Sequence, residues 1–137
     1  MNVLLDTNVV VDILSKRDGY EDSLRILAHC ETCRIKGFVS AVTVTDIMYI
    51  LRKHISPEAV RNAVQTLLLI VDVEDVLKND ISAAFKSNMK DFEDAVQVSC
   101  ASRINADYIV TRNAKDFRNS NVPAISPGNM LKMLDDA

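Results

Sequence analysis

Short apolar runs alternate with segments of helical periodicity along this chain, and no other feature limits the fold as strongly. Each run is a few residues long, as in a buried strand, and each intervening segment repeats apolar residues three and four positions apart. Strands that alternate with helices are typical of a mainly parallel sheet covered by helices. The sequence therefore predicts an α/β fold, a three-layer α/β/α sandwich around a short sheet.

The predicted elements cover most of the chain. Strands are predicted at residues 3–5, 38–40, 108–111 and 122–125. Helices are predicted at 6–14, 20–34, 44–51, 57–67, 75–85, 91–104 and 126–134. Residues 68–73 fit either a strand or the end of the preceding helix, because periodicity does not separate the two in so short a run.

The length of 137 residues is that of one ordinary domain, and the sequence contains no internal repeat or flexible linker. We therefore expect residues 1–137 to form a single domain. The 48% of hydrophobic and 26% of charged residues do not fit a disordered chain. Three Gly and three Pro argue against Gly-rich phosphate-binding loops and hairpin-rich sandwiches.

The cellular compartment is predicted from the absence of membrane and signal segments and from the number of cysteines. No apolar run approaches the roughly 20 residues of a membrane helix, and the N-terminus has no basic start of a signal peptide. Three cysteines, an odd number, favour a reducing cytoplasm. Cys30 and Cys33 form a CxxC pattern inside a predicted helix, where chance placement is favoured over a thioredoxin-like site that would need a cis-proline such as Pro123.

Acidic residues follow two of the predicted strands where each strand ends. Asp6 directly follows residues 3–5, and Asp116 lies in the loop after residues 108–111. In a parallel sheet the carboxyl ends of the strands lie at one edge, where ligands bind. We therefore expect Asp6 and the 111–116 loop to share one site.

Three further aspartates are candidates, and each has a structural alternative. Asp91 and Asp94 are three residues apart on one helix face, but they also resemble a helix-start cap. Asp46 lies within an apolar helix and could face solvent instead, and Asp6 is a favoured N-cap residue. Clustered carboxylates would repel by about 4 kcal/mol per close pair at an effective dielectric constant of about 20. A proton or a divalent cation would relieve this, and oxygen-only ligands select Mg²⁺ or Mn²⁺ over zinc.

Several motifs together indicate a family. They are Leu4-Leu5-Asp6-Thr7-Asn8, Asp46 in its helix, Asp91-Phe92-Glu93-Asp94-Ala95, Tyr108-Ile109-Val110-Thr111-Arg112-Asn113 and Asp116-Phe117. In their order the chain resembles PIN-domain proteins, of the VapC-like kind found as toxin ribonucleases of bacterial VapBC toxin–antitoxin pairs. Residues 125–134 resemble the family's last strand and helix, so the resemblance covers nearly the whole chain.

The resemblance implies a metal site of four acids. These are Asp6, Asp46, Asp94 and Asp116. Asp91 and Asn113 would stand beside the site, and Asn8 and Thr111 would orient the carboxylates. Family members more often have Glu at the position of Asp46, so this shorter side chain would bind the metal through water. Some relatives have the acid at the position of Asn113, whereas here Asp116 supplies the charge.

The implied function is that of a Mg²⁺- or Mn²⁺-dependent endoribonuclease that hydrolyses RNA phosphodiester bonds, with one or two ions activating a water. Arg112, Lys115 and Arg118 would hold substrate phosphates or belong to a solvated loop. The resemblance also implies a small antitoxin as partner and a homodimer.

Two alternatives stay open. The departure at Asp46 is compatible with a degenerate PIN module that binds RNA or protein without catalysis. A phosphoacceptor receiver domain is also Asp-rich at strand ends, but it would need paired acids after the first strand and Lys-Pro after the last. This chain has Asp6 alone and Val122-Pro123-Ala124 at those places.

The net charge of −3 does not by itself favour nucleic-acid binding. Setting aside Asp6, Asp46, Asp91, Asp94 and Asp116 leaves 14 acidic residues against 16 basic ones, a balance of +2. The acidic surplus is therefore expected in a pocket that a divalent ion would neutralise.

Overall fold

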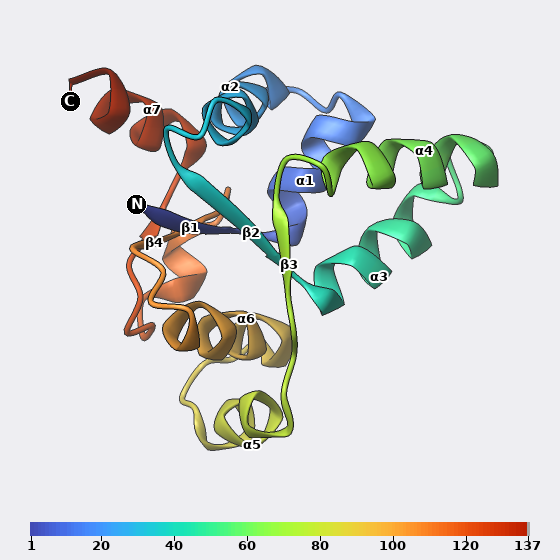
Figure 1. Cartoon of the computed structure of the whole chain (residues 1–137). Helices are drawn as coiled ribbons and strands as arrows, with labels where there is room; N and C mark the ends of the chain where they lie inside the picture. The colour runs from blue at the N-terminus through green and yellow to red at the C-terminus, as the bar shows by residue number, and fades with distance from the viewer. Residues whose placement is uncertain (137) are drawn as a thin grey trace.

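Five parallel strands form the central sheet, in the order β3-β2-β1-β4-β5. The computed structural model describes residues 1–136 (Figure 1). The strands are β1 (Asn2–Leu5), β2 (Lys36–Ser40), β3 (Asp72–Glu74), β4 (Tyr108–Val110) and β5 (Ala124–Ile125). Because all pairs are parallel, the carboxyl ends of the strands lie at the same edge of the sheet. The predicted α/β fold with a parallel sheet is confirmed.

Helices cover both faces of this sheet, with α5 and α6 on one side and α1, α2 and α7 on the other (Figure 1). The helices are α1 (Thr7–Ser15), α2 (Tyr20–Glu31), α3 (Ala41–Leu51), α4 (Pro57–Leu67), α5 (Lys78–Lys86), α6 (Phe92–Arg103), the short 3-10 helix η1 (Ala114–Phe117) and α7 (Pro127–Asp136). Alternation along β1 supplies both cores, because Val3 and Leu5 lie in one apolar cluster and Leu4 lies in the other. The molecule is therefore the predicted α/β/α sandwich. Between residues 1 and 136 no helix is long and apolar enough to span a membrane.

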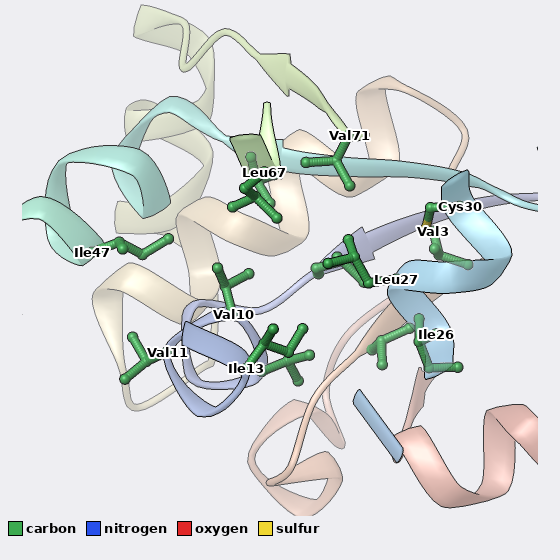
Figure 2. Packing of buried hydrophobic residues seen from close by; sticks show 14 of the residues in the cluster. Val3, Val10, Val11, Ile13, Ile26, Leu27, Cys30, Ile47, Leu67 and Val71 are labelled. Atoms are coloured by element: carbon green, nitrogen blue, oxygen red, sulfur yellow. The ribbon is translucent and has the colours of Figure 1, made fainter. Parts of the chain in front are cut away.

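The larger core lies between the sheet and the helices α1 to α4 and α7. Figure 2 shows side chains from α1 and α2, among them Val10 and Ile26, around Val3 of β1. Helix α2 packs so closely on β2 that a Cβ at Gly37 would lie 2.6 Å from Cys30 Sγ. Burial raises the pKa of the Cys30 thiol to about 11, while Cys33 is exposed. Cys30 therefore acts as a packing residue, in agreement with chance placement of the CxxC pattern.

The ends of two helices differ from the predicted ones because side chains compete for the backbone. Helix α2 ends at Glu31, three residues early, since Thr32 Oγ1 donates to the Ala28 carbonyl and Cys33 adopts a φ of 60°. Helix α5 begins at Lys78, three residues later than predicted. Its start is set by Asp80, whose Oδ2 accepts a hydrogen bond from the backbone N–H of the N-cap residue Leu77. The ambiguous segment 68–73 is a turn followed by the first two residues of β3.

A buried carboxylate fixes α5 against α6. Asp80 is 2% exposed and accepts hydrogen bonds from Ser99 Oγ at 2.7 Å and from Arg103 Nη2 at 3.0 Å. Arg103 also donates to Glu74 Oε1 at 2.7 Å and to the Asp75 carbonyl. This network joins the end of β3, α5 and α6, and it thereby holds the helix whose first turn carries candidate site residues.

Candidate metal centre

Asp6 lies at the carboxyl end of the central strand β1 and is 5% exposed. Its Oδ1 accepts from the Thr7 backbone N–H at 2.8 Å, so it caps α1 as the structural interpretation predicted. Its Oδ2 accepts from Thr111 Oγ1, which follows β4, also at 2.8 Å. Burial raises the pKa of the Asp6 carboxyl in spite of these hydrogen bonds. The same residue is therefore a helix cap and a desolvated carboxylate at the edge where ligands bind.

Asp91 and Asp94 lie at the start of α6. Asp91 Oδ1 accepts from the Asp94 backbone N–H at 2.9 Å, which makes Asp91 the N-cap of this helix. Burial raises the pKa of the Asp94 carboxyl to about 7, and the charges of Asp6, Asp91 and Asp116 add to the shift. The acids predicted from separate motifs are thus close enough to repel one another.

Asp46 faces Glu93, an acid that the sequence interpretation did not select. The hydrogen bond that protonated Glu93 donates to the Asp46 carboxylate raises the pKa of Glu93 to about 8, with burial and the charges of Asp46, Asp91 and Asp6 as further causes. Two carboxyls share a hydrogen bond only when one of them carries a proton. Sequence spacing shows that Glu93 precedes Asp94, but it does not show that the start of α6 meets α3.

These acids line a hollow of about 360 Å³, which we call the acidic hollow. Its lining is Asp6, Thr7, Asn8, Asp46, Ile50, Asp91, Glu93 and Asp94. A second hollow of about 620 Å³, the mixed-charge cleft, shares Asp91 and Asp94 with it. The rest of its lining is Asn88, Met89, Lys90, Lys115, Asp116, Arg118 and Asn119. The two hollows therefore meet at the first turn of α6.

Most of the remaining predicted site residues line one of these two hollows. Asn8 lines the acidic hollow, whereas Asp116 lines the mixed-charge cleft with Lys115 and Arg118. Asn113 uses its backbone N–H, which donates to Thr111 Oγ1 at 3.1 Å. Arg112 points elsewhere, because its Nε lies 3.2 Å from Oδ2 of the buried Asp12. Asp116 and Asp46 therefore line different hollows.

The donors of the acidic hollow suit a hard divalent cation. Asp6, Glu93 and Asp94 all have raised pKa values, and no Lys or Arg lines this hollow to offset their charge. All the charged donors are oxygens, as Mg²⁺ and Mn²⁺ prefer. Within residues 1–136 no three His, Cys, Asp or Glu side chains form a ready-made metal site. A shared ion would therefore require these carboxylates to rotate toward it.

We expect the metal-free protein to lose stability as pH rises from about 4 to about 8. Glu93 and Asp94 keep their protons up to pH values of about 8 and about 7 in the folded chain, whereas unfolded Asp and Glu carboxyls release theirs near pH 4. Since the folded state binds more protons across this interval, the free energy of unfolding falls with rising pH. Urea unfolding in EDTA measures it, and saturating Mg²⁺ should remove the decline. A flat profile in EDTA would contradict the proximity of these acids.

The fold and the site define a class, that of parallel α/β proteins with carboxylates gathered at the carboxyl edge of the sheet. The model of the PIN domain family matches residues 2–115, most of the chain. The chain therefore belongs to the PIN-domain family, as its motifs predicted. No curated protein sequence is significantly similar to it.

Solved structures share the fold at low sequence identity. VapBC2 from Rickettsia felis, bound to a promoter DNA fragment, has a TM-score of 0.72 at 21% identity, covering 92% of this chain and 98% of that chain. DNA-bound VapBC from Salmonella typhimurium has 0.73 at 15% identity, covering 93% and 98%. VapC20 from Mycobacterium tuberculosis, a sarcin–ricin loop cleaving toxin, has 0.64 at 14% identity, covering 78% and 86%. The fold is therefore VapC-like.

Proposed function

We propose that this chain is a metal-dependent endoribonuclease that hydrolyses RNA phosphodiester bonds, as the toxin of a type II toxin–antitoxin pair. The observation that carries the proposal is the buried carboxylate of Asp6, which shares the acidic hollow with Asp91 and Asp94 without a basic residue in its lining. Membership of the PIN-domain family and the VapC-like fold support it.

The proposed ligands of Mg²⁺ or Mn²⁺ are Asp6 and Asp94, with Asp116 and, through water, Asp46. A bound ion would activate a water for attack on phosphorus and stabilise the leaving oxygen. Thr111 orients the Asp6 carboxylate through its hydrogen bond. Asp91 fixes the first turn of α6 as its cap. Supporting roles for Asn8 and Asn113 are part of the same proposal.

We place the substrate phosphates in the mixed-charge cleft. Lys90, Lys115 and Arg118 line it together with Asp94, so cations and candidate metal ligands are within one hollow. Lys and Arg contacts to phosphate position a nucleic acid without reading its sequence. Arg112 is less suited to this role, because it is already paired with Asp12.

Neutralising one cation of the cleft should weaken RNA binding and its salt dependence together. For Lys90→Gln, Lys115→Gln or Arg118→Gln we expect the slope of log affinity against log salt to decrease by about 0.7, as for one lost phosphate contact on a single strand. Fluorescence anisotropy with labelled single-stranded RNA in EDTA measures both quantities. Lys86→Gln, an exposed lysine of α5 outside the cleft, is the control. Equal slopes for all four variants and the wild type would contradict the assignment.

The proposed partners follow from the same comparison. Similar structures from Rickettsia felis and Salmonella typhimurium are described as VapBC complexes. We propose that the partner of this chain is a small antitoxin and that the chain forms a homodimer, since the resemblance to VapC-like toxins implies both. We also propose that the protein acts in the cytoplasm.

The proposal is tested by incubating single-stranded RNA with the protein and Mg²⁺, Mn²⁺ or EDTA. Cleavage is expected with either metal and not with EDTA. RNA binding without cleavage under every condition would favour the alternative, a degenerate PIN module, for which Asp46 in place of the family's usual Glu is the specific observation. Induced expression in a bacterium tests the toxin role, since growth should stop with the wild type and continue with Asp6→Asn.

A further inference from the structure

Gln97 is a buried polar residue that the proposed mechanism does not use. Its side chain is 1% exposed on α6, one helical turn after Asp94. Its Nε2 donates to Thr43 Oγ1 at 3.2 Å and lies 3.5 Å from Asp6 Oδ1, at the outer limit of a hydrogen bond. Its Oε1 has no hydrogen-bond partner among the described residues. A buried amide with an unpaired oxygen calls for an explanation, because such groups are rare in folded proteins.

The position of Gln97 joins the three segments that carry the candidate ligands. Thr43 lies on α3 one turn before Asp46, and Gln97 lies on α6 one turn after Asp94. Asp6 directly follows β1. Gln97 Nε2 contacts both Asp6 Oδ1 and Thr43 Oγ1, and so links this strand end to the two helices. The single amide therefore bridges α3, α6 and the end of β1, the three segments that carry these candidate ligands.

Folding stability does not account for this amide. Without it, Asp6 Oδ1 would still accept from the Thr7 backbone N–H at 2.8 Å. Thr43 Oγ1 would keep its hydrogen bonds with the hydroxyls of Thr7 at 2.9 Å and Ser40 at 3.3 Å. An apolar side chain of the same size would leave neither partner unsatisfied, and it would remove the unpaired Oε1. Such a replacement should therefore be close to neutral, because it leaves no buried donor or acceptor unpaired.

We propose that Gln97 is a positioning residue of the metal centre, which fixes the separation of Asp6, Asp46 and Asp94. The inference rests on the proposed function, because it assigns to these carboxylates a common ion. Residues that orient metal ligands without touching the metal typically change its affinity by about 10- to 100-fold when mutated. Gln97 thus trades folding stability for a fixed spacing of the backbone segments that carry the ligands.

The test compares Gln97→Met, which is nearly isosteric, with the wild type. Calorimetric titration with Mn²⁺ should give a dissociation constant raised at least about 10-fold, while the urea midpoint in EDTA stays equal or rises. Gln65→Leu, an apolar change at an exposed glutamine of α4, is the control and should alter neither quantity. Gln97→Leu provides a second apolar variant if the methionine protein does not fold.

Two results would overturn the inference while leaving the proposed function intact. The first is a folded Gln97 variant that binds Mn²⁺ within twofold of the wild type. The second is a variant whose affinity falls only together with its urea midpoint, as a merely structural role predicts. If the wild type binds no Mn²⁺, or if Asp6→Asn binds it equally well, the proposed function and this inference both fail.

Discussion

Replacing Asp94 by Asn is expected to lower the rate of Mg²⁺-dependent RNA cleavage by about 10³-fold without loss of the fold. Asn keeps the shape of the side chain but removes the charge that would bind the ion. The several kcal/mol that a metal contributes to stabilising the transition state correspond to a factor of this size. Single-turnover cleavage of labelled RNA at saturating Mg²⁺ measures the effect.

The same substitution should not destabilise the folded protein. The pKa of Asp94 is raised to about 7 by burial and by the charges of Asp6, Asp91 and Asp116. A neutral amide removes that repulsion, so above pH 7 the urea midpoint in EDTA should equal or exceed that of the wild type. Asp18→Asn, at an exposed aspartate after α1, controls for the chemical change. A folded Asp94→Asn protein that cleaves as fast as this control would rule out Asp94 as a ligand.

Replacing Arg103 by Met is expected to lower the free energy of unfolding by about 3 kcal/mol, the low end of the cost of leaving one charge of a buried pair alone, because the Arg103 side chain is 30% exposed. Asp80 is 2% exposed and would lose its ion pair with Arg103 Nη2 at 3.0 Å. Glu74 and the Asp75 carbonyl would lose their hydrogen bonds from the same guanidinium. Urea unfolding measures the change, and Arg25→Met is the control, because its pair with Asp135 is exposed on both sides and should contribute below about 1 kcal/mol.

The pH dependence of this loss identifies Asp80 as its cause. Burial alone would raise the pKa of Asp80, but hydrogen bonds from Arg103, the Leu77 backbone N–H and Ser99 outweigh it and lower the pKa. A lowered folded pKa contributes stability that is present above the unfolded value of about 4 and is lost as pH falls through the folded one. The difference between wild type and Arg103→Met should therefore shrink below about pH 4. A difference that stays constant with pH would assign the effect to lost packing instead.

The architecture was predictable because it depends on local patterns. The apolar run at residues 3–5 ends at Asp6, and its alternation places Leu4 and Leu5 in different cores, so the strand and its two covered faces follow from the sequence. Helix ends were less predictable, since Asp80 caps a turn through its side chain and sets the start of α5. Such competition between side chain and backbone leaves no periodic signal.

The candidate site was predictable where strand order alone places residues. Asp6 and Thr111 end neighbouring parallel strands, and they are hydrogen-bonded in the structure. Glu93 and Gln97 were missed, because their contacts with Asp46 and Thr43 depend on α6 meeting α3, a contact between distant segments. Arg112 was expected to hold substrate phosphates or to belong to a solvated loop, and the structure pairs it with the buried Asp12 of α1. The one signal for Gln97 in the sequence was its place as a polar residue between Val96 and Cys100, which are both buried in the structure.

The most direct test of the central claim is the anomalous difference density of Mn²⁺ in crystals of the wild-type protein. The claim is that the acidic hollow holds a divalent ion between Asp6 and Asp94. It predicts a peak in that hollow, coordinated by carboxylate oxygens of both residues, and no such peak in crystals of Asp6→Asn. Saturating Mn²⁺ that gives no peak there, or a peak that persists in Asp6→Asn, would contradict the account.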